Sequence, residues 1–333
     1  MDLRRCRNAA IAATKWLLSQ QGEDGSFSPI EHGMATHNKL LWALGDMGQQ
    51  PKAARLAAWL RESALDGEGD FGGLARPEPY DHFFAVGNAF LAAGAMRLGH
   101  FALAYPALGL LSSLQHPETG GFLTAGPDAG LDDEQDVLTT ASCGQACLQG
   151  GQLGAAEAAG RFLLDLWEGQ PGGGGPRLFT SVCAPCQVVT EFPPEYATRY
   201  AVETGQREQG YHVPALAAGF LTCLYDATGD ASYLEGAHTY LQFLDSCAED
   251  RFTSERSGFV AWATSLAYEV TGSASYQRMA EAAAEGLLVT QLQNGSWLKG
   301  SLGADLTSDV VDATAEGIIV LNQVMRSLVA AED

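Results

Sequence analysis

The chain contains 333 residues, of which 46% are hydrophobic, so it can bury a large core. Forty acidic residues against nineteen basic ones give a formal net charge of −21, which would repel nucleic-acid phosphates and anionic lipids. Seven cysteines spread over a long chain do not suggest a disulfide framework. We therefore expect no nucleic-acid or membrane-surface partner, and we expect the thiols to be reduced.

The N-terminal segment, residues 1–18, reads as an amphipathic helix with Lys15 inside its apolar run. It lacks the small-residue cleavage site of a signal peptide. No run of 18 apolar residues occurs elsewhere in the chain. We expect a soluble, cytoplasmic protein.

From this helix onward the chain repeats one unit: an amphipathic helix, a polar loop closed by an aromatic residue, a partner helix and a short glycine turn. The loops close at Phe27, Phe71, Phe122, Phe179, Phe252 and Trp297. The partner helices are predicted to begin near Thr36, Asp81, Asp133, Tyr211, Gly258 and Asp309. The turns lie at Gly48, Gly99, Gly151, Gly229 and Gly272.

Six helical hairpins with short turns at one end and long loops at the other predict an all-α fold. Because no hairpin reads as a polar capping unit, the pattern favours a closed ring over an open solenoid. We predict a single domain over residues 1–333, an (α/α)6 barrel whose inner ring is made of the partner helices. The longest loop, at about residues 169–209, is predicted to be an insertion that forms a lid on the long-loop side.

Three helix ends carry a family resemblance: KWLLSQQGEDGSF, LLSSLQHPETGGF and LLVTQLQNGSW. They resemble the Gln-to-Trp repeats of the terpenoid cyclase and protein prenyltransferase superfamily, which is built on α/α toroids. The connection LYDATGDASYLEGAHTYL is also similar to toroidal sugar enzymes, such as acylglucosamine epimerases and unsaturated glucuronyl hydrolases. The resemblance implies the toroid architecture, and a shared fold does not fix the function.

The densest group of acids is PDAGLDDEQDVLTT, which precedes the third partner helix. Crowded carboxylates can raise the pKa of one member, which makes Asp133 and Asp136 candidate general acids. The alternative is that Asp132 or Asp133 caps the helix and the other acids favour its positive end in solvent. The segment LDDEQD lacks the Asp-x-Asp-Asp motif with which class II cyclases protonate an alkene. DDEQD has the spacing of the magnesium motif of class I terpene synthases, but those have another helical fold, so we expect no metal.

Further polar residues gather at the starts of the other partner helices, where the long loops meet the ring. A histidine beside a carboxylate can transfer protons near neutral pH, although most such residues cap or pack. The candidate catalytic residues are Asp136, Asp133, Asp81, His82 and His212. The candidate substrate-binding residues are His37, Tyr80, Glu208, Tyr211, Trp262 and Phe84.

The first functional hypothesis is a cofactor-independent cyclase or isomerase that acts by acid/base catalysis on an apolar small molecule, such as a terpenoid or polyene. The second is a carbohydrate-active hydrolase, lyase or epimerase that uses two carboxylates or a His and Tyr pair. The third is a non-catalytic toroid that binds a peptide or protein. An aliphatic and aromatic inner lining with one buried acid would favour the cyclase, and a polar cleft would favour the sugar enzyme. We expect a monomer or a homodimer.

Overall fold

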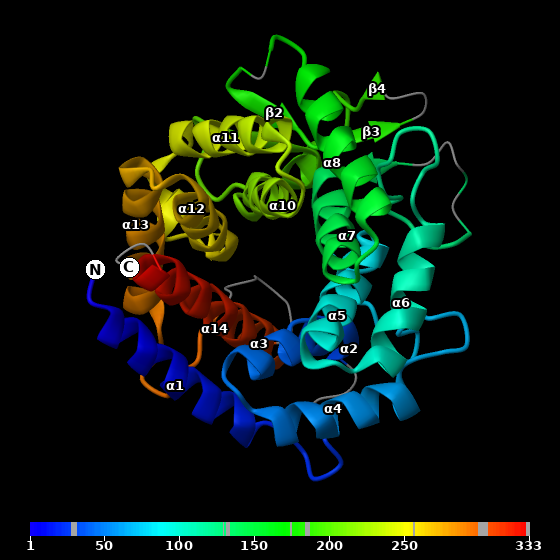
Figure 1. Ribbon diagram of the computed structural model, residues 1–333, viewed down its shortest axis with the longest axis vertical. Helices are drawn as coiled ribbons and strands as arrows, with labels where there is room; N and C mark the ends of the chain where they lie inside the picture. Colours follow the sequence, from blue (N-terminus) through cyan, green and yellow to red (C-terminus); the bar gives the residue numbers. More distant parts are fainter. Residues whose placement is uncertain are drawn as a thin grey trace.

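The computed structural model describes the chain except residues 28–31, 129, 131–133, 174, 184–186, 256, 299–305 and 331–333, and it describes only the backbone of residues 306–309. Its helices form two concentric layers (Figure 1). The inner layer contains α2 (Gly33–His37) with α3 (Leu40–Asp46), α5 (Phe84–Leu98), α7 (Val137–Gln149), α10 (His212–Thr228), α12 (Gly258–Thr271) and α14 (Leu306–Ala330). The outer layer contains α1 (Leu3–Ser19), α4 (Gln50–Ser63), α6 (Phe101–Ser113), α8 (Leu153–Glu168), α11 (Ala231–Ser246) and α13 (Ala274–Thr290).

The inner helices close into a ring. Each of α3, α5, α7, α10 and α12 contacts the next inner helix, and α14 contacts both α12 and α3. The first helix, α1, and the last, α14, therefore lie side by side (Figure 1). The predicted (α/α)6 barrel is confirmed. The glycine turns are also as predicted, because all five glycines have positive φ angles: Gly48, Gly99, Gly151, Gly229 and Gly272.

Small residues let the inner helices approach closely. A Cβ atom on Gly94 of α5 would lie 2.8 Å from the backbone nitrogen of Trp42 in α3. On Gly219 of α10 it would lie 2.0 Å from the ring of Trp262 in α12. Neither position has room for a side chain, which explains why the inner helices are rich in glycine and alanine.

The repeated loop ends have a common hydrogen-bonding pattern. The side-chain amide of Gln115 donates to the carbonyl of Gly120 in its own loop and to the carbonyl of Ala155 in the next outer helix, both at 2.9 Å. Gln291 does the same with Gly295 and with Ala9 of α1, and so ties the last loop to the first helix. Gln21 repeats the pattern with Gly25 and Lys52. These bonds explain why a glutamine recurs in the motif that carries the family resemblance: it joins its own loop to the next outer helix.

One partner helix is broken. The sequence predicts a continuous helix from about Thr36, but the helix stops after His37 and resumes at Leu40. At the break, the Asn38 side-chain amide donates to the carbonyls of Met34 and Ala35 at 2.9 and 3.1 Å. Asparagine side chains compete in this way with the regular helical bonds. The other partner helices begin within four residues of the predicted starts.

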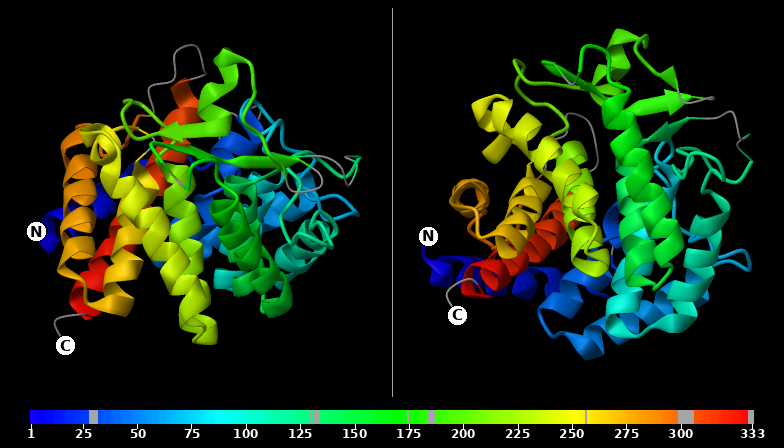
Figure 2. Two further views of the ribbon diagram at one scale, coloured as in Figure 1. Left: turned by 90° about the horizontal axis from the view of Figure 1, so that it is seen from above. Right: turned by 45° about the horizontal axis from the view of Figure 1, so that its top comes forward.

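The insertion predicted at about 169–209 is not irregular. It contains β2 (Arg177–Phe179), β3 (Ser181–Cys183), β4 (Gln187–Val188), β5 (Ala201–Glu203) and the short helices η2 (Pro194–Tyr196) and α9 (Ala197–Tyr200). Strand β3 pairs with β4 and with β1 (Gln135–Asp136), which leads into α7, while β2 pairs with β5. Its strands lie across the long-loop end of the barrel (Figure 2). We call this end the mouth.

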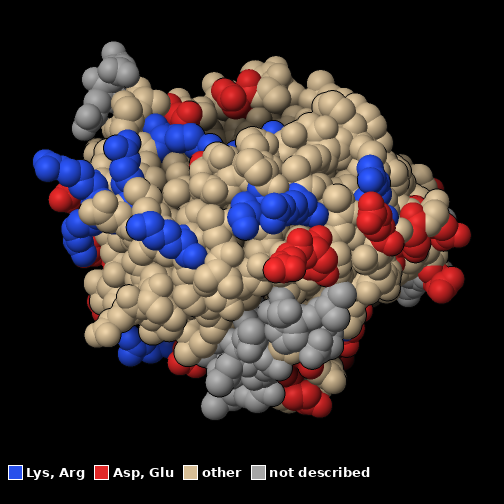
Figure 3. Space-filling view, turned by 90° about the horizontal axis from the view of Figure 1, so that it is seen from below, with Lys and Arg blue, Asp and Glu red and all other residues tan. Residues whose placement is uncertain are grey.

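Charge is unevenly distributed over the outer layer. Helix α1 carries four basic residues and no acidic one, and α4 carries three basic residues and one acidic residue. Lys and Arg side chains accordingly run across the face that these two helices form (Figure 3). The short helix η3 (Glu249–Phe252), between α11 and α12, carries two acidic residues and one basic residue. Within the described part of the chain, no helix is both long and apolar enough to cross a membrane.

Candidate functional site

Asp136 is the most distinctive polar residue at the mouth. It ends strand β1 and caps α7: its Oδ1 atom accepts a hydrogen bond from the Thr139 backbone N–H at 2.8 Å. Its side chain is buried, since the residue is 1% exposed. Its second oxygen, Oδ2, is also buried and accepts no hydrogen bond from any residue that the structure describes. A buried carboxyl oxygen without a donor is uncommon in folded proteins.

The surroundings of Asp136 favour its neutral form. Burial raises the pKa of the carboxyl group from 3.8 to about 7, although the hydrogen bonds from Thr139 oppose the shift. The negative charge of Glu134 adds to the increase in pKa. Along β1 the side chains alternate, and Gln135 points to the loop of Thr119, with which it is hydrogen-bonded. Asp136 therefore points away from that outer loop.

Three side chains form a second group beside Asp136, which we call the mouth cluster: His82, Glu134 and Tyr200. The Tyr200 hydroxyl donates to Glu134 Oε2 at 3.0 Å, and burial raises the pKa of this tyrosine to about 12. The His82 ring lies 6.3 Å from the Tyr200 ring. Burial lowers the pKa of His82, and the Glu134 carboxylate opposes this effect. The Nε2 atom of His82 and the Oε1 atom of Glu134 are buried without a hydrogen-bond partner in the described part of the protein.

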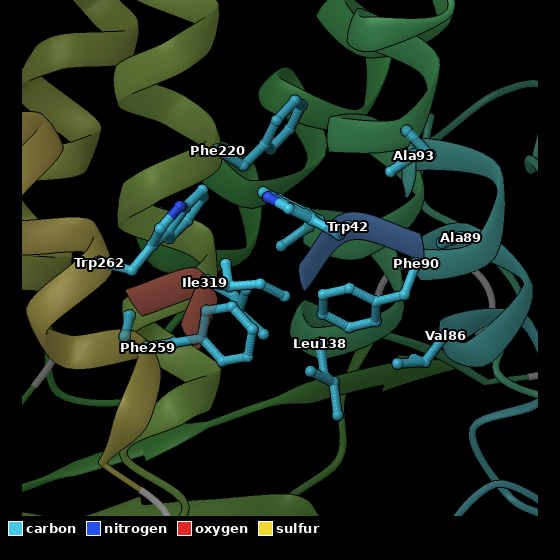
Figure 4. Close-up of a cluster of buried hydrophobic side chains, with 14 of the residues drawn as sticks. Trp42, Val86, Ala89, Phe90, Ala93, Leu138, Phe220, Phe259, Trp262 and Ile319 are labelled. Atoms are coloured by element: carbon cyan, nitrogen blue, oxygen red, sulfur yellow. The ribbon is translucent and has the colours of Figure 1, made fainter. Parts of the chain in front are cut away.

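The centre of the ring is aromatic. The rings of Phe90 and Phe259 are 5.7 Å apart, and Trp262 lies edge-on to both Phe259 and Trp42, at 5.8 and 6.4 Å. These side chains come from α3, α5 and α12 and point toward one another, with Leu138 of α7 beside them (Figure 4). They leave a cavity of about 10 Å³, which we call the interior cavity. Its lining is Trp42, Ala89, Phe90, Ala93, Ser142, Gln145, Leu216, Phe259 and Trp262.

A buried ionic group adjoins these rings. The Lys39 ammonium, at the break between α2 and α3, lies 2.8 Å from Asp312 Oδ1 and 2.8 Å from Glu316 Oε2 of α14. It also lies 5.5 and 5.8 Å from the ring centroids of Phe90 and Phe259. The two carboxylates share one ammonium, so each has a cation in contact and is compensated in that sense, in contrast to Asp136. We call Lys39, Asp312 and Glu316 the ionic triad.

The structure gives His37 a structural contact. The residue is fully buried between the layers, and its ring stacks on Trp59 of the outer helix α4 at 4.9 Å. Its Nδ1 lies 2.8 Å from the Gly33 carbonyl, and its Nε2 accepts from the Phe27 backbone N–H. Asn88, Thr140 and Thr314 accept the same kind of bond from the aromatic residues of later loops. We therefore assign His37 a structural role, as the acceptor of the hydrogen bond that closes each repeated loop. We do not retain it as a substrate-binding residue.

Tyr211 and Glu208 also take part in local structure. The Tyr211 hydroxyl donates to Asp250 Oδ1 at 2.8 Å, and the Glu208 backbone N–H donates to Asp250 Oδ2 at 2.6 Å. The Glu208 side chain is exposed. Its φ angle of 59° places it in the left-handed region. These contacts hold the start of α10 against the following loop.

The remaining candidates occupy different places. Asp133 lies outside the described residues. Asp81 is exposed, and its Oδ1 accepts from the backbone N–H of His82 in a turn. His212 is partly buried at the first position of α10. The structure thus brings Asp136 and His82 to one region around Glu134, while Asp81 faces solvent.

Three substrate-binding candidates are near the barrel interior or its mouth. Trp262 is 3% exposed and lines the interior cavity. The Tyr80 hydroxyl lies 3.0 Å from the Asn38 side-chain amide. Phe84 begins α5, and the Arg76 guanidinium lies 4.3 Å from its ring centroid. Among the described residues, no group of His, Cys, Asp and Glu is arranged to hold a metal ion.

The sequence-based site list omitted the ionic triad and Glu134. Asp312 and Glu316 are four residues apart, so their side chains lie on one face of a helix, which is the signal that could have suggested a shared cation. Their partner Lys39 is more than 270 residues away in sequence, as the separations of 273 and 277 show. Only the closure of the ring brings them together.

Comparison by sequence finds no relatives: no protein-family model matches the chain, and no curated protein matches it. Comparison of structures does find similar proteins, and those described here are 12–14% identical to this chain. A D-mannose isomerase superposes with a TM-score of 0.71 and 12% identity, covering 96% of this chain and 97% of its own. A sugar epimerase from a ruminal bacterium gives 0.69 and 13%, covering 98% and 99%.

A type II terpene cyclase from Scytonema, solved with geranylgeranyl dihydroxybenzoate, gives a TM-score of 0.58 and 14% identity, covering 97% of this chain and 98% of its own. At these identities the likeness shows the fold alone. The neighbours are (α/α)6 toroids, and they are enzymes of several reaction classes. The resemblance found in the sequence motifs is therefore confirmed at the level of the fold.

Proposed function

We propose that this protein is a cofactor-independent cyclase or isomerase that uses acid/base catalysis on an apolar small molecule within the barrel. One observation carries the proposal: a buried carboxyl group with a free oxygen lies at the mouth of a barrel whose interior is lined by aromatic rings. A sugar-binding cleft would need several polar groups in that lining, and rings from Phe90, Phe259 and Trp262 dominate it instead. The terpene cyclase among the structural neighbours is consistent with this chemistry.

Asp136 is assigned as the general acid. Its pKa of about 7 means that a large fraction of the molecules carry the proton at neutral pH. The Thr139 N–H fixes Oδ1, which leaves Oδ2 to deliver the proton to a double bond or to a heteroatom of the substrate. The electron pair of the double bond forms the new C–H bond, and a cation develops on the neighbouring carbon. The faces of the interior rings attract such a cation.

His82 is assigned as the base that removes a proton at the end of the reaction. Burial lowers its pKa, which favours the neutral ring that can accept a proton. Its Nε2 has no partner in the described part of the protein, so this atom is the one assigned to the substrate. Glu134 influences the pKa of both His82 and Asp136 and thus connects the acid and the base electrostatically. His212 remains the alternative base.

Substrate binding requires rearrangement of side chains. The interior cavity has a volume of about 10 Å³, about that of one water-sized probe. A polyene can enter only when rings such as Phe90 and Phe259 rotate away from the barrel axis. We therefore place the substrate in the volume that these side chains now fill.

The test is to incubate the full chain with linear polyenes, including farnesol and geranylgeraniol, in D₂O. Protonation of a double bond followed by loss of a different proton gives a product isomeric with the substrate that contains one solvent deuterium. Mass spectrometry detects this increase, and Asp136→Asn should reduce product formation by about 10²–10⁴-fold. Equal turnover by the variant and the wild type would refute the assignment of the acid.

The carbohydrate-active alternative is supported by the mouth cluster, where Glu134 and His82 present unpartnered buried atoms beside Tyr200. Such polar groups could contact sugar hydroxyls. Titration with mannose and with mannooligosaccharides distinguishes the two functions. Saturable sugar binding that Glu134→Gln abolishes, without binding of polyenes, would favour the sugar enzyme.

A further inference from the structure

A hydroxyl group of the insertion lies directly opposite Asp136. Strand β1 pairs antiparallel with β3, and in this register Asp136 is opposite Ser181. Opposite residues on adjacent strands place their side chains on the same face of the sheet. Both residues are 1% exposed. The Ser181 Oγ, like the Asp136 Oδ2, is buried without a hydrogen-bond partner in the described part of the protein.

The register also brings the two side chains close together. The Val137 N–H donates to the Thr180 carbonyl at 2.9 Å, so these two residues occupy a hydrogen-bonded position of the ladder. Because such positions alternate along an antiparallel pair, Asp136 and Ser181 occupy the non-hydrogen-bonded position, where opposite side chains are closest. Their Cβ atoms are then about 4.5–5.5 Å apart. Rotation about the Cα–Cβ bond lets a serine hydroxyl reach a carboxyl oxygen across this spacing.

The backbone of Ser181 is fixed on both sides. Strand β3 is the central strand of its sheet, between β1 and β4. On the β4 side, the Val189 N–H donates to the Ser181 carbonyl at 2.9 Å. The preceding residue, Thr180, lies on the opposite face of the strand, and its hydroxyl donates to the Arg199 carbonyl at 2.8 Å. A hydrogen bond between Ser181 and Asp136 therefore requires movement of side chains alone.

We propose that Ser181 is a positioning residue for Asp136: its hydroxyl bonds to Oδ2 and stabilises the carboxylate that remains when the proton has passed to the substrate. In that step the Asp136 O–H bond breaks, the proton goes to the substrate, and the electron pair stays on Oδ2. Ser181 keeps its own proton throughout. A hydroxyl can accept from the protonated acid and donate to the carboxylate, and the bond to the charged form is the stronger of the two. This inference rests on the proposed function, because it assigns a partner to the acid of that reaction.

The ionisable groups around Asp136 stay the same throughout the test. Glu134 precedes it in the chain, and its charge raises the pKa of Asp136. His82 interacts in turn with Glu134. Cys143 lies on α7, where burial raises the pKa of its thiol well above the ordinary value and keeps it neutral. Cys183 lies on β3. Because the variants below change none of these groups, a difference in the ionisation of Asp136 reports the hydroxyl.

The test measures the ionisation of Asp136 without any substrate. Infrared spectra of the full chain are recorded between about pH 5 and pH 9, a range centred on the pKa of about 7. The C=O stretch of the protonated carboxyl group is identified as the band that Asp136→Asn removes. In Ser181→Ala the midpoint of its titration should move up by about one pH unit, a tenfold decrease in the acid dissociation constant, because the carboxylate has lost a donor. Ser181→Cys, with a weak donor, should move the midpoint in the same direction.

Two variants serve as controls. Ser181→Thr keeps the hydroxyl and should keep the wild-type midpoint. Thr180→Val is the matched control, because it removes from the adjacent residue a hydroxyl that is bonded to the Arg199 carbonyl, and it should leave the midpoint unchanged. Circular dichroism verifies that each variant folds. With a polyene as substrate, Ser181→Ala should lower kcat about tenfold at an unchanged KM, because the lost bond forms as the proton leaves.

The outcomes separate this inference from the proposed function. An unchanged midpoint in Ser181→Ala and Ser181→Cys would overturn the role of Ser181 and leave the proposed function standing. An equal shift in Thr180→Val would overturn it as well, because the effect would then come from the strand and not from the hydroxyl. A shift confined to Ser181→Ala and Ser181→Cys, in a protein that converts no polyene, would support the hydrogen bond and refute the proposed function instead.

Discussion

The buried carboxylates at the start of α7 and in α14 have opposite surroundings. At the start of α7, Asp136 has one oxygen on a backbone N–H and the other without a donor. In α14, Asp312 and Glu316 share the Lys39 ammonium, and Asn38 donates a further bond to Asp312. Burial is nearly equal in the two places, at 1% exposure for Asp136 and 7% for Asp312. The difference between them is compensation, which makes one region a candidate for proton transfer and the other a structural joint.

The ionic triad should dominate stability. Lys39→Met removes the cation and leaves two carboxylates buried against each other, which costs about 3–5 kcal/mol of unfolding free energy. Urea unfolding monitored by circular dichroism measures the change. Lys15→Met on the exposed face of α1 is the control and should change stability by less than about 0.5 kcal/mol. A loss below about 1 kcal/mol for Lys39→Met would mean that the triad is not a compensated unit.

Removal of the Asp136 charge should stabilise the folded protein at high pH, whereas removal of the Lys39 charge should destabilise it. Burial raises the pKa of the folded state to about 7, above the ordinary value of 3.8, so the folded protein keeps a proton that the unfolded chain loses. Stability is therefore lost as the pH rises between these values, by about 2–3 kcal/mol from pH 5 to pH 8. Asp136→Asn removes this dependence and retains a good helix cap.

The measurement is urea unfolding of wild type and Asp136→Asn at pH 5 and at pH 8. The variant should gain stability relative to wild type as the pH increases. Asp81→Asn is the control, because it removes an exposed carboxylate and reports the general effect of net charge. A constant difference between wild type and Asp136→Asn at the two pH values would show that Asp136 ionises normally in the folded state.

The rate of the proposed reaction should follow the same group. A general acid must be protonated, so kcat should fall by about tenfold for each pH unit above about 7. Steady-state assays between pH 6 and pH 9 provide the profile. Asp312→Asn, in the ionic triad, is the control. In the folded fraction of this variant, kcat should begin to fall at the same pH as in the wild type. A rate that rises through pH 8 would exclude Asp136 as the acid.

The sequence predicted the ring because its evidence is local. Helical periodicity and glycine turns repeat along the chain, and each hairpin forms from neighbouring segments. The break at Asn38 and Lys39 escaped prediction because it depends on a side chain that bonds its own helix and on a cation drawn to α14. The strands of 169–209 escaped because they are only two or three residues long, too short for an alternating pattern.

The candidate site was predicted less completely. Asp136 was selected because we expected it one turn inside a partner helix, whereas the structure places it at the N-cap and adds its burial and its free oxygen. His37 and Tyr211 met the same positional criterion, yet their contacts are with Trp59 and Asp250 of the surrounding layer. Position along a helix does not reveal which layer a side chain faces at a frayed or capped end.

The mouth cluster lies between the two extremes, and it offers the smallest predicted effect. Glu134 has one oxygen on the Tyr200 hydroxyl and the other without a partner among the described residues, so it is half compensated. Tyr200→Phe removes this donor, and Glu134→Gln removes the charge. A double-mutant cycle on unfolding free energy should give a coupling of about 1 kcal/mol.

Tyr196→Phe, which changes an exposed tyrosine of the same insertion, is the control and should show no coupling with Glu134→Gln. Because Tyr200 belongs to the insertion and Glu134 precedes α7, a coupling near zero would show that the insertion is not energetically tied to the mouth, and the contrast would reduce to Asp136 and the ionic triad alone.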